Sequence, residues 1–110
     1  MNRRPYLGRL NALVTVEAPQ DVIDAGGATR RSFSVYGQVW AQIKPTRLFM
    51  RVEGGRQSGL VSHMITFRAI PGFSCDWRLR QGDRLFLVDS FDDGDEVSGF
   101  TRALCQEVRP

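Results

Sequence analysis

The sequence predicts an all-β fold, a small antiparallel β-barrel or sandwich of about five or six strands. Apolar and polar residues alternate along several segments, and no long stretch shows a convincing apolar period of 3.6 residues. Turn sequences rich in glycine, proline and aspartate separate these segments. The chain has 110 residues, the size of one domain, so we expect a single domain over 1–110.

Alternation begins at residues 10–18, which predict a first strand with its even-numbered side chains on one face. The sequence Asp-Ala-Gly-Gly at 24–27 predicts a turn, and residues 32–44 predict a long second strand. Gly37 lies inside that strand and indicates a bulge or a sharp bend. Pro45 ends it, because proline donates no hydrogen bond to a strand ladder.

Three further strands are expected in the second half of the chain, at 60–70, 84–91 and 100–108. Residues 76–80 are too short and mixed to assign. The acidic run 92–96 (Asp-Asp-Gly-Asp-Glu) reads as the solvated tip of a hairpin. No helical segment is long enough for a crossover between parallel strands, so we expect antiparallel pairing.

Residues 46–58 do not fit this strand count. The segment joins the second and third strands with thirteen residues, many more than a hairpin needs. Its first half has the length of two helical turns, and Gly54-Gly55 would end such a helix. We therefore expect a projecting loop, and loops of this length in small domains are often functional.

Charge is unevenly distributed along the chain, whose net charge is +3. Residues 1–51 carry eight basic and three acidic side chains, whereas residues 52–110 carry seven basic and nine acidic ones. This asymmetry suits head-to-tail contact between copies, although scattered surface charge explains it equally well. Residues 1–9 are basic, lack the apolar core of a secretory signal, and predict a flexible N-terminal arm. No apolar run approaches a membrane span, so we expect no membrane contact.

The residues do not favour an enzyme or a metal site. His63 is the only histidine, lies in a predicted strand, and has no recognisable nucleophile motif beside it. The acidic run 92–96 lacks the ligand spacing of a calcium loop. Cys75 and Cys105 lack zinc spacing, and we expect two reduced thiols. We expect no catalytic residues, no metal and no cofactor.

A nucleic-acid-binding barrel is an alternative. The sequence pI is about 9.4, and Tyr36, Trp40 and Phe49 are candidates for a stacking surface. However, basic residues do not interleave with Tyr36 and Trp40 on one strand face. Packing of Trp40 against a neighbouring element or subunit is the better interpretation, because tryptophan is enriched at interfaces.

Six short blocks occur in an order that resembles the head-closure (stopper, or head–tail joining) proteins of tailed bacteriophages. Two of the blocks are V-W-A-Q-I-K-P at 39–45 and H-M-I-T-F-R at 63–68, and the resemblance rests on the order of all six. The other matching blocks are Gly8-Arg9-Leu10 with 14–19, Asp24 with Gly27 and Thr29, 82–86, and Cys105-Gln106-Glu107-Val108. Fourteen of the fifteen basic residues are arginine, which suits a phage, or a phage-like gene transfer agent, of a GC-rich host.

The resemblance implies a non-enzymatic β-barrel subunit of the virion neck, assembled in the bacterial cytoplasm. Copies would form a homo-oligomeric ring of six or twelve between the portal and adaptor above and the tail terminator or tail tube below. The ring would close the DNA-filled head, join the tail, and surround double-stranded DNA in an axial channel. A tail-terminator or tail-completion protein of the same neck remains an alternative, as does a stand-alone nucleic-acid-binding barrel.

The resemblance also implies roles for three groups of residues. The projecting loop would gate the DNA channel through Arg47, Leu48, Phe49, Met50, Arg51, Arg56 and Gln57. The neighbouring ring would be contacted by Arg3, Arg4, Tyr6, Arg9 and Trp40. Charges between subunits would come from Arg30, Arg31, Asp92, Asp93, Asp95 and Glu96.

Overall fold

A computed structural model describes residues 10–53, 56–92 and 99–108, with the side chains of 47–60 left out of the description. The described residues form six strands and no helix. The strands are β1 (Ala12–Ile23), β2 (Thr29–Glu53), β3 (Arg56–Arg68), β4 (Arg78–Gln81), β5 (Arg84–Asp92) and β6 (Phe100–Val108). They close into an antiparallel barrel in the order β1-β2-β3-β6-β5-β4. The expected all-β antiparallel fold is confirmed.

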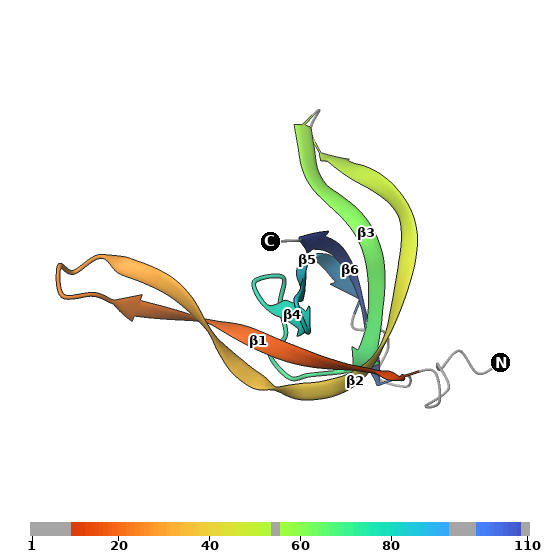
Figure 1. Cartoon of the computed structure of the whole chain (residues 1–110). Helices are drawn as coiled ribbons and strands as arrows, with labels where there is room; N and C mark the ends of the chain where they lie inside the picture. Colours follow the sequence, from red (N-terminus) through yellow and green to blue (C-terminus); the bar gives the residue numbers. More distant parts are fainter. Residues whose placement is uncertain (1–9, 54–55, 93–98, 109–110) are drawn as a thin grey trace.

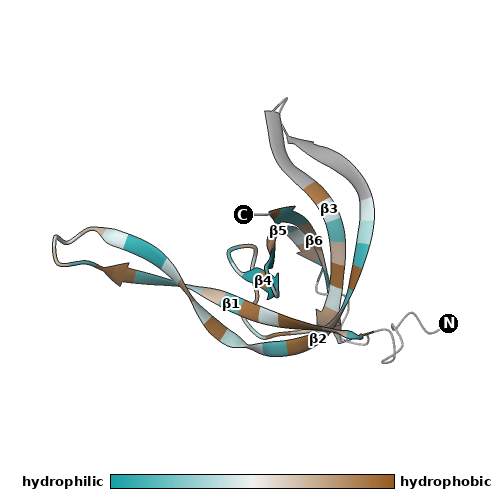
Figure 2. Ribbon diagram, in the orientation of Figure 1, coloured by the Kyte–Doolittle hydropathy of each residue, from teal (hydrophilic) through white to brown (hydrophobic). Residues whose placement is uncertain are grey.

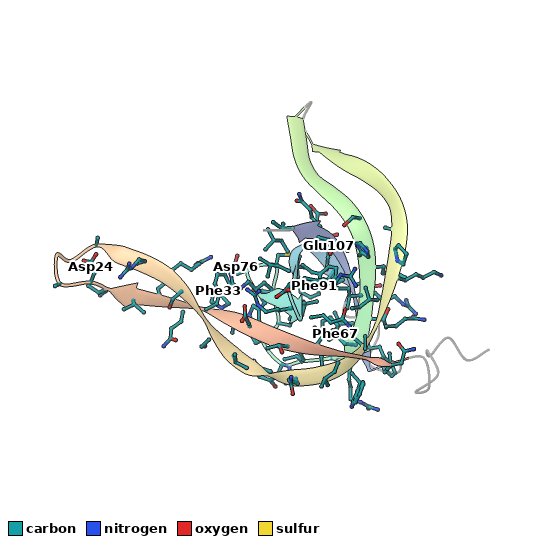
Figure 3. All side chains as sticks on the ribbon, in the orientation of Figure 1. Asp24, Phe33, Phe67, Asp76, Phe91 and Glu107 are labelled. Carbon is teal, nitrogen blue, oxygen red and sulfur yellow. The ribbon has the colours of Figure 1, made fainter. Side chains whose placement is uncertain are left out.

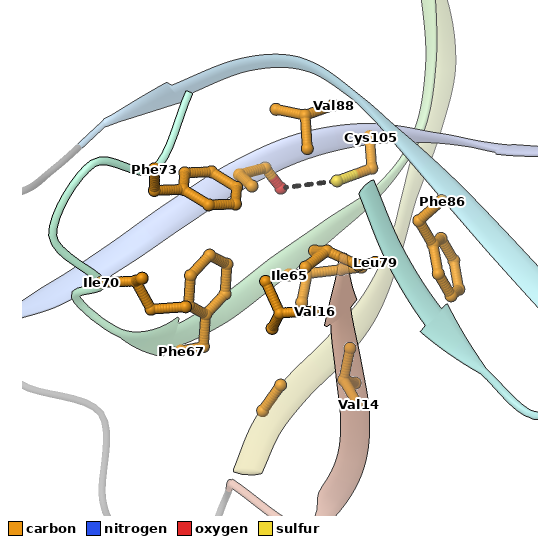
Figure 4. Close-up of a cluster of buried hydrophobic side chains, with 12 residues drawn as sticks. Val14, Val16, Ile65, Phe67, Ile70, Phe73, Leu79, Phe86, Val88 and Cys105 are labelled. Carbon is orange, nitrogen blue, oxygen red and sulfur yellow. Dashed lines mark hydrogen bonds between the residues drawn. The ribbon is translucent and has the colours of Figure 1, made fainter. Parts of the chain in front are cut away.

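The core lies inside the barrel and follows from the alternation of the sequence. In β1, Val14 and Val16 are fully buried, whereas Leu13 and its cross-strand partner Trp40 are exposed. Phe73 bridges the core, because its ring meets those of Phe67 and Phe91 edge to face at 5.2 and 5.1 Å. Figure 4 shows the cluster, including the buried thiol of Cys105, which donates to the carbonyl of Ala103.

Strands β1 and β2 continue beyond the barrel as a two-stranded hairpin (Figure 1). They pair as far as Ile23 and Thr29, whereas β4 pairs with β1 only from Thr15 to Glu17. We call residues 18–34 the β1–β2 arm. At its tip, the Asp24 carboxylate accepts hydrogen bonds from the amides of Gly26 and Ala28, both at 2.9 Å. The predicted turn is therefore confirmed, but the sequence interpretation missed that the hairpin projects.

A bulge lies at the base of the β1–β2 arm, as Gly37 suggested. Val16 pairs with Gly37 while the next residue, Glu17, pairs with Val35, so Tyr36 is an extra residue in β2. A bulge increases the local twist and bends the strand pair. It lies where the pairing of β4 with β1 ends, at Glu17, and the arm leaves the barrel.

Strands β2 and β3 form a second projecting hairpin, which rises from the barrel in Figure 1. We call residues 46–53 and 56–61 the β2–β3 arm. The segment 46–58 was expected to be a loop with helical turns, and that expectation is wrong for the described residues, which are strand. Glu53 pairs with Arg56, and a Gly-Gly pair between two strands is typical of a hairpin turn. The sequence pattern of β2 alone did not reveal this, because the pairing partner follows the turn.

Residues 76–80, which the sequence left unassigned, contain the start of β4. This strand of four residues joins β1 to β5 and so closes the barrel. Its side chains alternate between Arg78, the fully buried Leu79 and Arg80. The alternation was too short to be read alone, but burial of Leu79 fixes the register of the strand.

Candidate functional site

A polar cluster lies at the end of the barrel from which the β2–β3 arm rises. Arg84 on β5 donates to both carboxylate oxygens of Glu107 on β6, from Nε at 2.9 Å and from Nη2 at 3.2 Å. Only 8% of the Glu107 side chain is exposed. This hydrogen bonding to Glu107 raises the pKa of Arg84, so the guanidinium stays charged.

His63 on β3 belongs to the same cluster. Its Nε2 lies 3.4 Å from Arg84 Nη2, and its Nδ1 lies 2.9 Å from the hydroxyl of Ser62. The same Nε2 also lies 3.7 Å from Glu107 Oε1, so His63 contacts both members of the Arg84–Glu107 pair. The ring also meets Phe86 edge to face at 5.4 Å. The structure thus places His63 in a hydrogen-bonded strand position, as the sequence suggested.

A hollow of about 300 Å³ opens beside this cluster. It is lined by Asn11, Ala12, Ile43, Pro45, His63, Gln81 and Arg84. Arg84 Nη1 also donates to the Gln81 carbonyl oxygen at 3.2 Å, so the cation is held by two side chains on its own face of the barrel. The hollow marks the base of the β2–β3 arm, because its lining residues Pro45 and His63 are the last strand partners before the arm begins.

A larger groove, of about 520 Å³, lies beside Trp40. Its described lining is Leu10, Val39, Trp40 and Arg68. Trp40 is 58% exposed although it is among the largest apolar side chains of the chain. An exposed indole over an apolar groove is typical of a protein interface. The sequence singled out Trp40 for this role; Arg68 belongs to the H-M-I-T-F-R block at 63–68 but was not assigned to a contact surface.

The β1–β2 arm exposes apolar side chains on both faces. Ile23 is 73% exposed, Val22 is 46% exposed, and Val35 beside the base of the arm is 64% exposed. Arg31 is held within the chain, by Asp21 at 3.3 Å and Asp76 at 3.8 Å, so its expected role between subunits competes with these pairs. The sequence interpretation missed Val22 and Ile23, although an apolar pair beside a polar turn was a usable signal (Figure 2).

The arm is braced against the barrel at its base. The guanidinium of Arg78 hydrogen-bonds to Glu17 and stacks over the ring of Phe33 at 3.9 Å. Figure 3 labels Phe33 near the point where the arm meets the barrel. Tyr36 packs against Trp77 with the ring centroids 5.5 Å apart. Tyr36 is therefore engaged with its own chain, which weakens the alternative of a free aromatic surface for stacking bases.

The residues expected to gate a channel come together on the β2–β3 arm. Arg51 pairs with Gly59, Val52 with Gln57 and Glu53 with Arg56, so β2 and β3 both contribute. Several other expected site residues lie outside the described part of the chain: Arg3, Arg4, Tyr6, Arg9, Asp93, Asp95 and Glu96. Asp92 is described and pairs with Arg102 across β5 and β6, while Arg30 is exposed on β2.

In the part of the chain that the structure describes, no group of three or more histidine, cysteine, aspartate or glutamate side chains is arranged to hold a metal ion. Within the same ranges, no helix is long and apolar enough to cross a membrane.

Comparison with known proteins identifies the family. Residues 7–108 match the family described as phage head completion protein. A chain in the virion of a native gene transfer agent particle has the same fold, with a TM-score of 0.67 and 23% identity over 97% of this chain and 100% of that one. Protein SF1141 from Shigella flexneri 2a also shares the fold, with a TM-score of 0.67 and 16% identity over 92% of this chain and 95% of that one.

No curated protein sequence matches significantly. The family match covers the barrel and both arms, and it agrees with the resemblance seen in the sequence blocks. Proteins of this family are structural and not enzymatic. This chain therefore belongs to the phage head completion protein family, which has a structural role in phage head and tail assembly.

Proposed function

We propose that this protein forms the head-closure ring of a phage or a phage-like gene transfer agent, between the portal or adaptor and the tail. The observation that carries the proposal is the pair of long hairpin arms on a closed barrel. Strand closure leaves the barrel without free edges, so assembly relies on the arms and on outward side chains. The two arms leave the barrel in different directions, which suits contacts with different neighbours.

The β1–β2 arm and the Trp40 groove are the proposed assembly surfaces. Ile23, Val35 and Trp40 together expose more apolar surface than a small barrel needs to leave open. A ring of identical copies requires a heterologous interface, in which two different surfaces of the chain meet. An arm that extends the molecule to 56 Å along its longest axis provides such reach.

The β2–β3 arm is the proposed gate. It contains Arg47, Arg51 and Arg56, and in a ring these residues would be gathered around the axis. Arginine binds phosphate through paired donors, so this surface suits double-stranded DNA passing through the ring or stopped within it. The family match supports a place at the head–tail junction, and the ring, its copy number and the channel are our proposal.

Shortening the β2–β3 arm tests the gate. Phe49 and Val61 are strand partners, so replacing residues 50–60 with Asn-Gly closes the hairpin directly above them. We expect the shortened protein to enter particles, whose heads then leak DNA or fail to join tails. The readouts are packaged DNA per particle and the fraction of particles with tails.

A matched control shortens the other arm. Gln20 and Ser32 are partners, so residues 21–31 are replaced with Asn-Gly in the same way. Because this variant lacks Val22 and Ile23, we expect it to enter particles poorly. The particles that do contain it are expected to retain their DNA. Sealed, tailed particles from the shortened β2–β3 arm would remove the gate from the proposal.

A neighbouring role in the same neck is the second candidate. A tail-terminator or tail-completion protein would also use the Trp40 groove and two arms. The position in the particle separates the candidates, because a closure ring contacts the adaptor whereas a terminator caps the tail tube. Site-specific cross-linking from Arg68, beside the groove, identifies the contacted protein.

A further inference from the structure

We infer that the β2–β3 arm pivots where it joins the barrel, at residues 46–48 of β2 and Ser62 of β3. The hydroxyl of Ser62 acts as a clamp that holds the arm in the position seen here. This inference deepens the proposed function, since the arm is the proposed gate. Its test uses the isolated chain, so it can fail without affecting the role in the particle.

The pairing of β3 with both of its neighbours, β2 and β6, changes at Ser62. From Ala41 to Pro45, β2 pairs residue for residue with β3, and Pro45 pairs with His63. The next pair is Phe49 with Val61, so three residues of β2 lie opposite Ser62 alone. On the other side, the pairing of β3 with β6 ends at His63 and Cys105. Above this level the described strand pairings join β2 only to β3.

The hydroxyl of Ser62 takes the place of the next backbone hydrogen bond between β3 and β6. If the pairing continued, Val61 would lie opposite Glu107, but the amide of Glu107 instead donates to Ser62 Oγ at 2.9 Å. The hydroxyl in turn donates to the carbonyl of Cys105 at 3.5 Å. His63 Nδ1 also lies 2.9 Å from Ser62 Oγ, so this hydroxyl has three polar contacts. The side chain of Ser62 thus connects β3, at the base of the arm, to β6.

The clamp is anchored in the barrel. Glu107 is paired with Phe86 on β5, and its carboxylate is held by Arg84. Val61, the residue of the arm next to Ser62, is fully buried and adds apolar packing at the base of the arm. The irregular segment 46–48 has no one-to-one partners, and bulged strand pairs are where hairpins bend. A short hinge beside a rigid anchor is the usual design of a hinged element.

Spin-label distances in the isolated protein test the clamp. Cys75 is exposed and takes a label on the barrel, and Gln57→Cys adds one on the arm. Cys105 stays unlabelled, because burial raises its pKa to about 12. We expect one narrow distance distribution for this protein, and one about twofold broader, or with a second distance, for Ser62→Ala. Ser62→Thr keeps the hydroxyl and is expected to stay narrow.

Two further variants sharpen the test. Ser34→Ala removes an exposed hydroxyl from the β1–β2 arm and is expected to leave the distribution unchanged. Deleting Arg47 and Leu48 leaves Thr46 opposite Ser62 and restores one-to-one pairing. Because two residues are removed, every side chain keeps its face of the strand. This deletion is expected to narrow the distribution again in the Ser62→Ala background.

Hydrogen exchange provides an independent readout on the same variants. Loss of the Ser62 hydroxyl is expected to speed exchange of the Glu107 amide about tenfold, while the amide of Ala103 in the core stays protected. Protection of Ala103 also shows that the variant is folded. Equal distance distributions for the parent and Ser62→Ala would overturn the clamp. A broad distribution that persists after the 47–48 deletion would overturn the pivot.

Discussion

Burial separates the two cysteine side chains, and their reactivity follows from it. Cys75 is exposed, whereas Cys105 is fully buried among core residues. Burial, with smaller contributions from Asp89 and Cys75, raises the pKa of Cys105 to about 12. The thiolate is the reactive form, so at pH 8 almost none is present at Cys105.

Alkylation with iodoacetamide at pH 8 is therefore expected to modify Cys75 alone in the folded protein, and both residues in denaturant. Because the raised pKa favours the neutral thiol when folded, the folded protein loses stability as pH rises from about 9 toward 12. Mass spectrometry of the tryptic peptides gives the readout. Rapid modification of Cys105 under native conditions would contradict the packing described.

Phe67 and Trp40 are two large aromatic side chains with opposite roles. Phe67 is fully buried and meets the ring of Phe73, so Phe67→Ala is expected to cost about 3–5 kcal/mol of unfolding free energy. Trp40 is 58% exposed, so Trp40→Ala is expected to change stability by less than about 0.5 kcal/mol. Urea unfolding measures both.

The same Trp40→Ala variant is expected to enter particles poorly, because it removes the apolar rim of the groove. Phe67→Ala is the comparison, since it weakens the fold and leaves the surface intact. Normal incorporation of Trp40→Ala would mean that the groove is not an assembly surface. Both variants are compared with the parent by quantifying the protein in purified particles.

At the scale of the elements, the sequence predicted the strands well where one face is buried. Val14, Val16, Ile65 and Phe67 alternate with polar or exposed neighbours, and this pattern fixes both the strand and its register. The Asp24 turn and the Gly37 bulge were also predictable, because each has a local chemical cause. The short strand β4 was not, since four residues carry too little periodicity.

The sequence interpretation predicted that residues 46–58 project, but it missed that both arms are paired strands and that the β1–β2 hairpin also projects. A strand that leaves the barrel no longer needs an apolar face, so 18–34 and 46–58 lack the alternation by which strands are recognised. The candidate site was predictable only in part for the same reason. Trp40 stood out by residue type, whereas the Ser62–Glu107 contact depends on strands that meet only after folding.

At the scale of the whole molecule, the closed barrel contains the core, and the two arms are the proposed assembly and gating elements. The core of the barrel lies between strands that pair on both sides, so the fold does not depend on the arms. The β1–β2 arm exposes Val22 and Ile23 beyond the barrel, and the β2–β3 hairpin rises from the barrel in another direction (Figure 1). This division is what a subunit of a ring with several neighbours requires.

The measurement that tests this account most directly is a density map of the assembled particle, at a resolution that traces single strands. We predict a ring of these barrels at the head–tail junction, with every β2–β3 arm turned toward the axis and every β1–β2 arm on a neighbouring subunit. A map in which this chain is a lone monomer, or in which the β2–β3 arms face outward from the axis, would contradict the account.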